Sequence, residues 1–160
     1  MSGKQANEGI ASISKHKGNL AETKVAADLM AKGFFVAHPR EEFLPFDLVA
    51  IMSDGKNYVF YKVQVKYAEI DVHGAARADL RPRHETAART GRKYTKGEVD
   101  VFAIYVPDVD RCFYVDSSIV DKNSRCFSVR ISPPSDNVKN YNLMEDYTDF
   151  PVEAFIEVEE

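Results

Sequence analysis

The chain has 160 residues, enough for one domain with a sizeable core, and its composition, 44% hydrophobic and 29% charged, is ordinary for a globular protein. No apolar run approaches the roughly 20 residues of a membrane span, and Met1–Asn7 lacks the apolar stretch of a signal peptide, so we expect no membrane association and a cytoplasmic location. The net charge of −4 argues against a uniformly basic nucleic-acid binder.

The charge is unevenly distributed along the chain. Residues 132–160 carry one basic and eight acidic side chains, a net charge of −7, which leaves 20 basic and 17 acidic residues, or +3, in residues 1–131. Within residues 71–97, three acidic side chains oppose seven basic ones: Arg77, Arg81, Arg83, Arg89, Arg92, Lys93 and Lys96. Because a local basic field binds phosphate, we expect this segment to contact DNA; an ordinary soluble loop is the alternative.

The first predicted element is a helix between Asn19, a good N-cap, and Gly33, a good C-terminal stop; residues 1–16 are expected to form a flexible arm. Glu22 follows Asn19 by three residues, as in a capping box. Glu22 also begins the apolar stripe that would pack toward a sheet, so a capping role and a role in a site both remain open.

A β-hairpin is the clearest predicted element. Residues 46–52 and 57–70 are expected to form two strands around an Asp54–Gly55 turn. A two-residue turn there places Asp47 opposite Lys62. Side chains alternate along a strand, so one face is expected to carry Asp47, Lys62, Gln64 and Lys66.

The remaining pattern completes an α/β fold with a central mixed sheet flanked by helices. Residues 71–97 are expected to form a long loop, and residues 132–160 an acidic segment that docks on a domain spanning residues 17–131. The other predicted elements are strands at 34–37, 99–106, 111–116 and 125–131 and a short helix at 117–121. The cysteines, Cys112 and Cys126, form no CxxC motif and are expected to be reduced thiols rather than zinc ligands.

The hairpin and helix together predict a phosphodiester-cleaving site. Asp47 offers a hard oxygen ligand for Mg²⁺, and Gln64, its diagonal neighbour on the expected hairpin, offers a neutral one. Lys66 can orient or deprotonate the attacking water, and Glu22 can hold a second ion or a water on the metal. Two simpler interpretations stay open: Asp47 bonded to a turn, and a solvated hairpin face carrying Gln64 and Lys66.

These residues resemble a known family. The order Glu22, then Phe46–Asp47, then Gln64–Val65–Lys66 is similar to the PD-(D/E)xK nuclease superfamily, in which a helical Glu, a strand Asp and a (D/E)xK strand follow one another. The residues around Glu22 and Asp47 are similar to the branch that contains group I intron homing endonucleases and Holliday-junction resolvases, and the QxK form is closer to the intron endonucleases. Two departures stand out: Phe46 precedes the aspartate, and Gln64 replaces the acid. The resemblance covers roughly residues 17–116.

The resemblance implies a restriction-endonuclease-like core and a metal-dependent DNA endonuclease acting on duplex or branched DNA. It implies metal ligation by Asp47, Gln64 and the Val65 carbonyl, with Lys66 as the catalytic lysine and Glu22 as a supporting acid. It also implies Mg²⁺, with Mn²⁺ as a substitute, and a homo-oligomer, either dimer or tetramer. Two alternatives keep the fold: a DNA-binding or regulatory module without cleavage, and an interaction domain whose acidic segment binds a basic partner.

Overall fold

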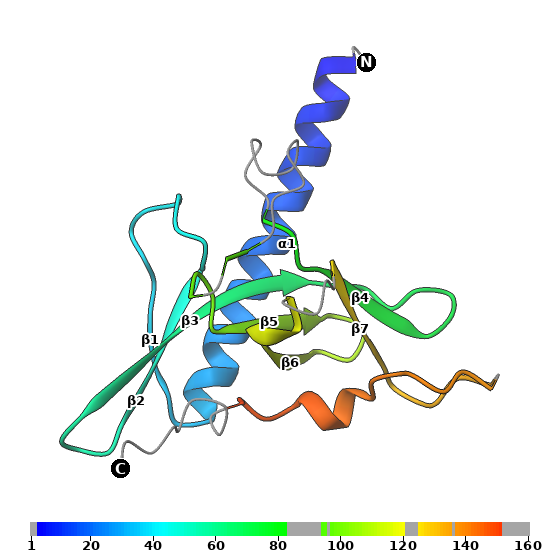
Figure 1. Ribbon diagram of the computed structural model, residues 1–160. Coiled ribbons are helices and arrows are strands. Elements are labelled where there is room, and N and C mark those ends of the chain that lie inside the picture. Colours follow the sequence, from blue (N-terminus) through cyan, green and yellow to red (C-terminus); the bar gives the residue numbers. More distant parts are fainter. Residues whose placement is uncertain (1–2, 83–93, 96, 121–124, 136, 152–160) are drawn as a thin grey trace.

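The computed structural model describes residues 3–82, 94–95, 97–120, 125–135 and 137–151, and it contains a mixed five-stranded sheet with a long helix on one face (Figure 1). The strand order is β1-β2-β3-β5-β6; β3 and β5 are parallel, and the other pairs are antiparallel. The strands are β1 (Phe35–Ala37), β2 (Leu48–Ser53), β3 (Tyr58–Tyr67), β5 (Val101–Val106) and β6 (Arg111–Asp116). The predicted α/β restriction-endonuclease-like core is therefore confirmed.

Helix α1 (Gly3–Ala31) is longer than expected, and its N-terminal half extends beyond the sheet (Figure 1). It includes most of the expected arm, because the residues before Asn19 contain no proline and include many helix formers despite their polarity. Asn19 lies inside the helix, where its carbonyl accepts a hydrogen bond from Thr23 Oγ1 at 2.9 Å. The capping box between Asn19 and Glu22 is therefore not formed.

The predicted end of the helix is correct. Gly33 has φ of +92°, its N–H donates to Met30 O at 3.0 Å, and Phe34 N–H donates to Leu29 O at 3.0 Å. This is a Schellman ending, in which only glycine adopts the left-handed conformation without strain. Leu29 and Phe34 are both buried in the same apolar cluster, and their burial fixes the angle at which the chain leaves α1.

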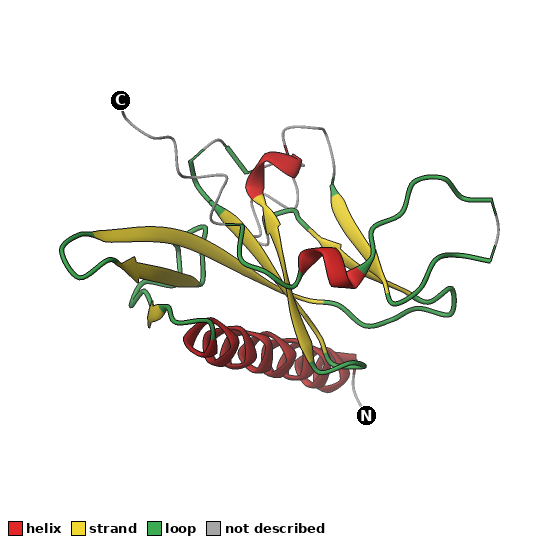
Figure 2. Cartoon of the chain, turned by 90° about the horizontal axis from the view of Figure 1, so that it is seen from below, coloured by secondary structure: helices red, strands yellow, loops and turns green. Residues whose placement is uncertain are grey.

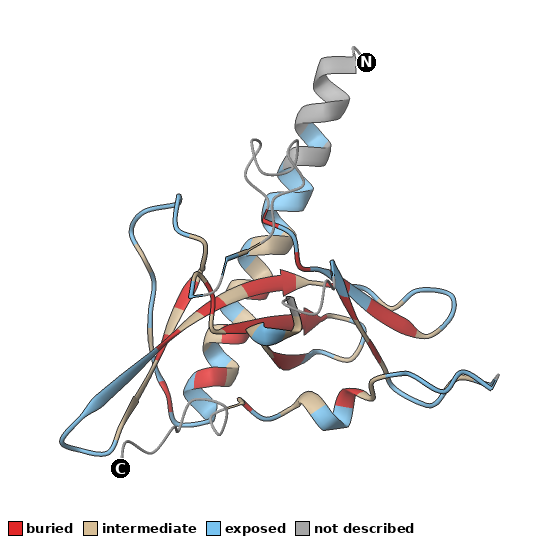
Figure 3. Ribbon diagram, viewed as in Figure 1, coloured by how far each residue is buried: buried red, intermediate tan, exposed pale blue. Residues whose placement is uncertain are grey.

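The sheet separates two hydrophobic clusters, and Figure 3 shows buried positions along its strands and on α1. On one face, α1 buries Ala21, Val25 and Leu29 against the strands. The opposite face carries a second, two-stranded sheet of β4 (Ala75–Asp79) and β7 (Cys126–Arg130), and Figure 2 shows α1 on the other side of the main sheet. The strand β3 is buried or half-buried from Tyr61 onward, whereas its first three residues are exposed, so packing holds the part that carries Gln64 and Lys66.

Strand β4 lies where a long loop was expected. Its alanines have weak strand propensity, so the sequence carries little strand signal. Ala76 and Ala78 are nevertheless fully buried, and β4 pairs with β7, about 50 residues further along the chain. Asp71 Oδ1 fixes the preceding turn by accepting N–H bonds from His73 at 2.8 Å and Ala75 at 3.1 Å.

The β2–β3 hairpin forms with a register that differs from the expected one. Ser53 lies opposite Tyr58, because Gly55, with φ of +91°, and Lys56 occupy the centre of the turn. Asp54 Oδ1 stabilises this turn by accepting the N–H of Lys56 at 2.8 Å and of Asn57 at 2.7 Å. The shift spans two positions, so each side chain keeps its predicted face.

The acidic C-terminal segment belongs to the fold as far as it is described. Met144, in the 3₁₀ helix η2 (Met144–Tyr147), is buried beneath the second sheet. The Phe150 ring packs against those of Phe34 and Tyr61, with ring centroids 4.7 and 5.3 Å away. Deleting residues 135–160 would therefore remove core side chains, so such a deletion does not test a role for this segment in partner binding.

Two smaller predicted elements are confirmed. The short helix is present as η1 (Ser117–Val120), and β6 has the predicted limits. Both cysteines are free; burial raises the pKa of the Cys112 thiol to about 12, so it stays protonated at neutral pH. Within the described part of the chain, no helix combines the length and hydrophobicity needed to cross a bilayer.

Candidate active site

Asp47 is hydrogen-bonded to strand β3 rather than to a turn. It lies just before β2, and its N–H donates to Val63 O at 2.9 Å. Its Oδ2 accepts the N–H of Val65 at 2.8 Å and the side-chain amide of Gln64 at 2.6 Å. The register therefore sets Asp47 beside Gln64, closer than the diagonal neighbour that the sequence predicted.

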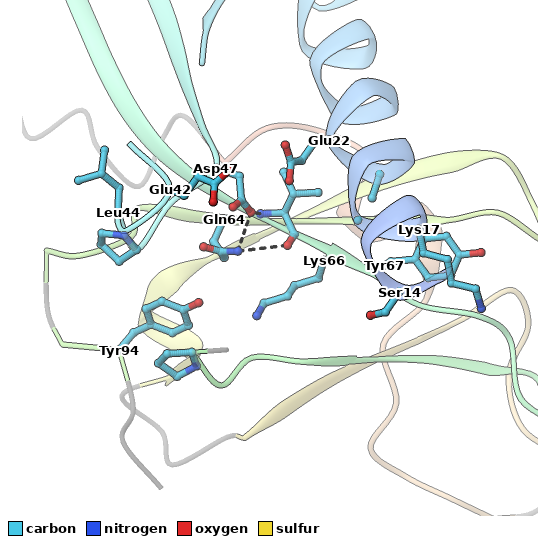
Figure 4. A pocket seen from close by; sticks show the side chains of 15 residues that line it. Ser14, Lys17, Glu22, Glu42, Leu44, Asp47, Gln64, Lys66, Tyr67 and Tyr94 are labelled. Carbon is cyan, nitrogen blue, oxygen red and sulfur yellow. Dashed lines mark hydrogen bonds between the residues drawn. The ribbon is translucent and has the colours of Figure 1, made fainter. Parts of the chain in front are cut away.

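The Gln64 amide group lies between two oxygen atoms. Its Nε2 donates to Asp47 Oδ2 and also lies 3.3 Å from the backbone oxygen of Val65 (Figure 4). A donor with partial positive charge thus bridges a carboxylate and a carbonyl. A cation would satisfy the same two oxygens, and half a turn of the amide would present Oε1 as a third.

Lys66 is the one charged side chain among the buried residues of the described chain, with 5% exposure. Its Nζ donates to the backbone oxygen of Arg81 at 3.1 Å and lies 5.7 Å from the ring centroid of Tyr94 (Figure 4). A buried ammonium needs such partners to offset its lost hydration. Lys66 is therefore not on a solvated hairpin face, whereas Lys62 is partly exposed and bonds to the carbonyl of Gly97.

Glu22 faces the hairpin from α1. It is half-buried, and burial raises the pKa of its carboxyl group, with a smaller contribution from the negative charge of Asp47. The two negative charges repel each other, so a cation bound near both carboxylates would be stabilising.

A cavity of about 320 Å³ joins these groups. Its walls come from α1, the loop before β2, strand β3 and the chain on both sides of residues 83–93 (Figure 4). The predicted residues Glu22, Asp47, Gln64, Val65 and Lys66 all line it. Additional lining residues include Ser14, Lys17, Glu42, Tyr67 and Tyr94.

Only part of the predicted basic surface lies among the described residues. Arg77 is exposed on β4, outside the cavity. Arg81 Nη2 binds Asp79 Oδ2 at 2.7 Å, and this hydrogen-bonded guanidinium lowers the pKa of Asp79. The positions outside the described residues are Arg83, Arg89, Arg92, Lys93 and Lys96.

The family model for PD-(D/E)XK endonucleases matches residues 13–150 of this chain. The chain belongs to the PD-(D/E)XK endonuclease family. The match spans the helix with Glu22, the hairpin with Asp47 and Gln64, and the core as far as Phe150. Nuclease activity is therefore the class of function that the family supports.

The fold of this PD-(D/E)XK endonuclease is similar to that of a solved bacterial homing endonuclease, I-Ssp6803I. The TM-score is 0.62 and the sequence identity 20%, over 83% of this chain and 86% of that one. At this identity the likeness concerns the fold. No curated protein matches the chain.

A divalent cation fits the donor atoms of this family member, although the site is poor in acids. Among the described residues, no three His, Cys, Asp or Glu side chains come together in a way that could hold a metal ion. The candidate ligands are therefore mixed: the Asp47 carboxylate, the Val65 carbonyl and the Gln64 amide oxygen. The Gln64 Nε2 between the first two marks a position suited to positive charge.

The sequence analysis did not identify several other residues that line the cavity or contact Lys66. Tyr94 and the Arg81 carbonyl contact Lys66 through long-range folding that no local pattern indicates. Ser14 and Lys17 were missed for another reason. They precede Ala21 and Glu22 at helical spacing, and that signal becomes visible only when the helix is extended through the expected arm.

Proposed function

We propose that the protein is a metal-dependent DNA endonuclease whose catalytic residues are Asp47, Gln64, Lys66 and Glu22. The observation that supports this best is the meeting of all four side chains at one cavity in a PD-(D/E)XK family member. When bound, Mg²⁺ or Mn²⁺ supplies positive charge beside the phosphate and acidifies water.

The chain's own residues have separable roles in this proposal. The Val65 N–H holds Asp47 Oδ2 in place, and this same oxygen faces the position of the Gln64 amide nitrogen, where a cation would bind. Gln64 must rotate its amide to present Oε1, and a neutral amide leaves the site less negative than the usual acid would. A less negative site repels a DNA phosphate less and binds the cation more weakly.

Lys66 is proposed to orient the attacking water and to stabilise the negative charge that develops on the phosphoryl oxygens. Its ammonium stays at the cavity wall through the Arg81 carbonyl and the Tyr94 ring. Catalysis requires Nζ to leave the carbonyl of Arg81 and approach the phosphate. Glu22 is proposed to accept a hydrogen bond from a water on the cation.

The test is cleavage of supercoiled plasmid and of a branched DNA with Mg²⁺, with Mn²⁺ and with chelator. We expect nicking by the wild type that chelator abolishes and that Lys66→Ala reduces by about 10²-fold or more, the contribution typical of proton-transfer and charge-stabilising groups. Circular dichroism of Lys66→Ala controls for folding. Equal cleavage by the wild type and Lys66→Ala, or cleavage that chelator does not affect, would refute the proposal.

A DNA-binding or regulatory module on the same fold is the second candidate. The observation that favours it is the bonding seen at the site, where Gln64 donates to Asp47 and Lys66 donates to Arg81. This candidate predicts salt-dependent DNA binding that survives both chelator and Asp47→Ala, with no cleavage in either metal.

We further propose that the protein acts as a dimer or tetramer, because two sites related by symmetry suit the cutting of both strands of a duplex. Light scattering of the purified protein with and without duplex DNA tests this. A monomer under both conditions that still cuts both strands would contradict it.

A further inference from the structure

One wall of the cavity lies on α1, and the candidate active site uses only Glu22 of it. The residues of this wall recur at helical spacing, so they form one stripe along the helix: Ser14, Lys17, Gly18, Ala21 and Glu22. Lys17 precedes Glu22 by five residues, which corresponds to about 7.5 Å along the helix axis. The cavity therefore has an acidic part near Glu22 and a basic, hydroxyl-bearing part near Lys17.

Lys17 is held at the cavity edge by partners that can be exchanged. Its Nζ binds Glu69 Oε1 at 2.6 Å and lies 5.1 Å from the ring centroid of Tyr67, and Figure 4 shows it beside Ser14 and Tyr67. The hydrogen bond to Glu69 raises the pKa of Lys17, so the ammonium is charged. The two side chains are 39% and 54% exposed, and ion pairs this exposed stabilise a fold little.

Gly18 leaves the helix surface open beside Lys17. A glycine inside a helix costs about 1 kcal/mol relative to alanine. No close packing requires it here, because a Cβ at Gly18 would meet no atom within 4 Å. The small residue clears space on the cavity wall instead, which suits the close approach of a ligand backbone.

We propose that Lys17 and Ser14 form a subsite for a phosphodiester group of the bound DNA strand, next to the phosphate that is cleaved beside Asp47 and Gln64. The Lys17 ammonium exchanges Glu69 for the phosphate, and the Ser14 hydroxyl donates a hydrogen bond to it. This inference rests on the proposed function and adds a binding position to it.

The competing explanation is that Lys17 only clamps α1 to the sheet. The chain provides an internal control, because the same arrangement recurs seven residues further along the helix. Lys24 Nζ binds Asp110 Oδ1 at 2.7 Å and lies 5.8 Å from the ring centroid of Tyr105. This second group lies outside the cavity that contains Asp47.

The experiment measures binding of a fluorescein-labelled duplex in chelator by anisotropy over a series of salt concentrations. The proteins are the wild type, Lys17→Gln, the control Lys24→Gln, Glu69→Gln and the double variant Lys17→Gln/Glu69→Gln. One lost phosphate contact lowers the magnitude of the slope of log K against log salt by about 0.9. We expect that loss in Lys17→Gln and an unchanged slope in Lys24→Gln. Glu69→Gln should bind more tightly than the wild type, and the double variant should lose that gain.

The outcomes separate this inference from the proposed function. Equal slopes for the wild type, Lys17→Gln and Lys24→Gln would show that Lys17 is a clamp and would overturn the subsite. The expected slopes without any cleavage in Mg²⁺ or Mn²⁺ would support the subsite and refute the endonuclease. A wild-type protein that binds no DNA would overturn both.

Discussion

Two Lys–Tyr–acid groups connect α1 to the sheet, and they differ in their surroundings rather than in their chemistry. One joins Lys17, Tyr67 and Glu69, and the other joins Lys24, Tyr105 and Asp110. The two tyrosines are register partners on β3 and β5, with ring centroids 6.2 Å apart. Only the first group faces the cavity with Asp47 and Lys66. Local contacts alone therefore do not separate a structural clamp from part of a binding site.

The acids near the two groups also differ in their electrostatics. The hydrogen bond from Lys24 lowers the pKa of Asp110, whereas burial and Asp47 raise the pKa of Glu22. The first acid already has its positive partner in the protein. The second has none among the causes that shift its pKa, which is the condition expected of a carboxylate that awaits a cation.

The largest expected effect is on the cleavage rate. It distinguishes Asp47, which lines the cavity, from Asp110, the acid of the second group. Asp47→Asn removes the carboxylate that orders Gln64 and Val65, and we expect cleavage to fall by about 10³-fold, as for the loss of a group that stabilises transition-state charge. Asp110→Asn, the matched change outside the cavity, should leave the cleavage rate within about twofold. Plasmid nicking at saturating Mg²⁺ measures both. A similar loss in the two variants would mean that the distinction between the two regions is wrong.

The Gln64→Glu variant tests whether the cavity binds a cation beside Asp47. The new carboxylate would lie against Asp47 Oδ2, where the Gln64 amide now donates at 2.6 Å. We expect a loss of stability of about 1–3 kcal/mol without metal, because a hydrogen bond is replaced by repulsion between like charges. Mg²⁺ should then raise the Tm of Gln64→Glu more than that of the wild type. Thermal unfolding with and without Mg²⁺ measures this, and equal Mg²⁺ shifts would argue against a cation at this position.

The smallest expected effects are on the pH dependence of folding stability. Glu22 and Asp110 are expected to change it in opposite directions. The raised pKa of Glu22 means that the wild type loses stability as pH rises through and above the ordinary glutamate range. Glu22→Gln should therefore be more stable than the wild type at pH 7, and the difference should vanish at acidic pH.

Asp110 has a lowered pKa, so its contribution is present at neutral pH and is lost as the pH falls through the folded-state value. Asp110→Asn should be slightly less stable than the wild type at pH 7 and equal to it in acid. Urea unfolding in chelator at several pH values tests both variants. Destabilisation of Glu22→Gln at pH 7 would contradict the electrostatic account of the site.

Much of the site could be predicted, because the residue spacing of strands and helices determines which side chains share a face. The two-residue period of β3 sets Gln64 and Lys66 on one face whatever the exact turn, and the turn shift of two positions preserved that face. Glu22 followed from the helical spacing of Val25 and Leu29, although the helix began at Gly3 rather than near Asn19.

The rest depended on contacts between distant segments. The pairing of β4 with β7 and the burial of Phe150 against Phe34 join residues that no local pattern relates. The contacts of Lys66 with Arg81 and Tyr94 likewise require the folded chain. For this reason the sequence indicated the chemistry of the lysine and its face of the strand, but neither its burial nor its partners.

The Val65 amide offers a spectroscopic view of the site. Unlike an interior sheet amide bonded to a neighbouring strand's carbonyl, it donates to the Asp47 carboxylate at 2.8 Å. Its ¹H–¹⁵N resonance should therefore respond to the charge on that carboxylate, and its chemical shift should change when a cation binds the carboxylate. One NMR crosspeak would then report occupancy of the centre without any DNA or turnover.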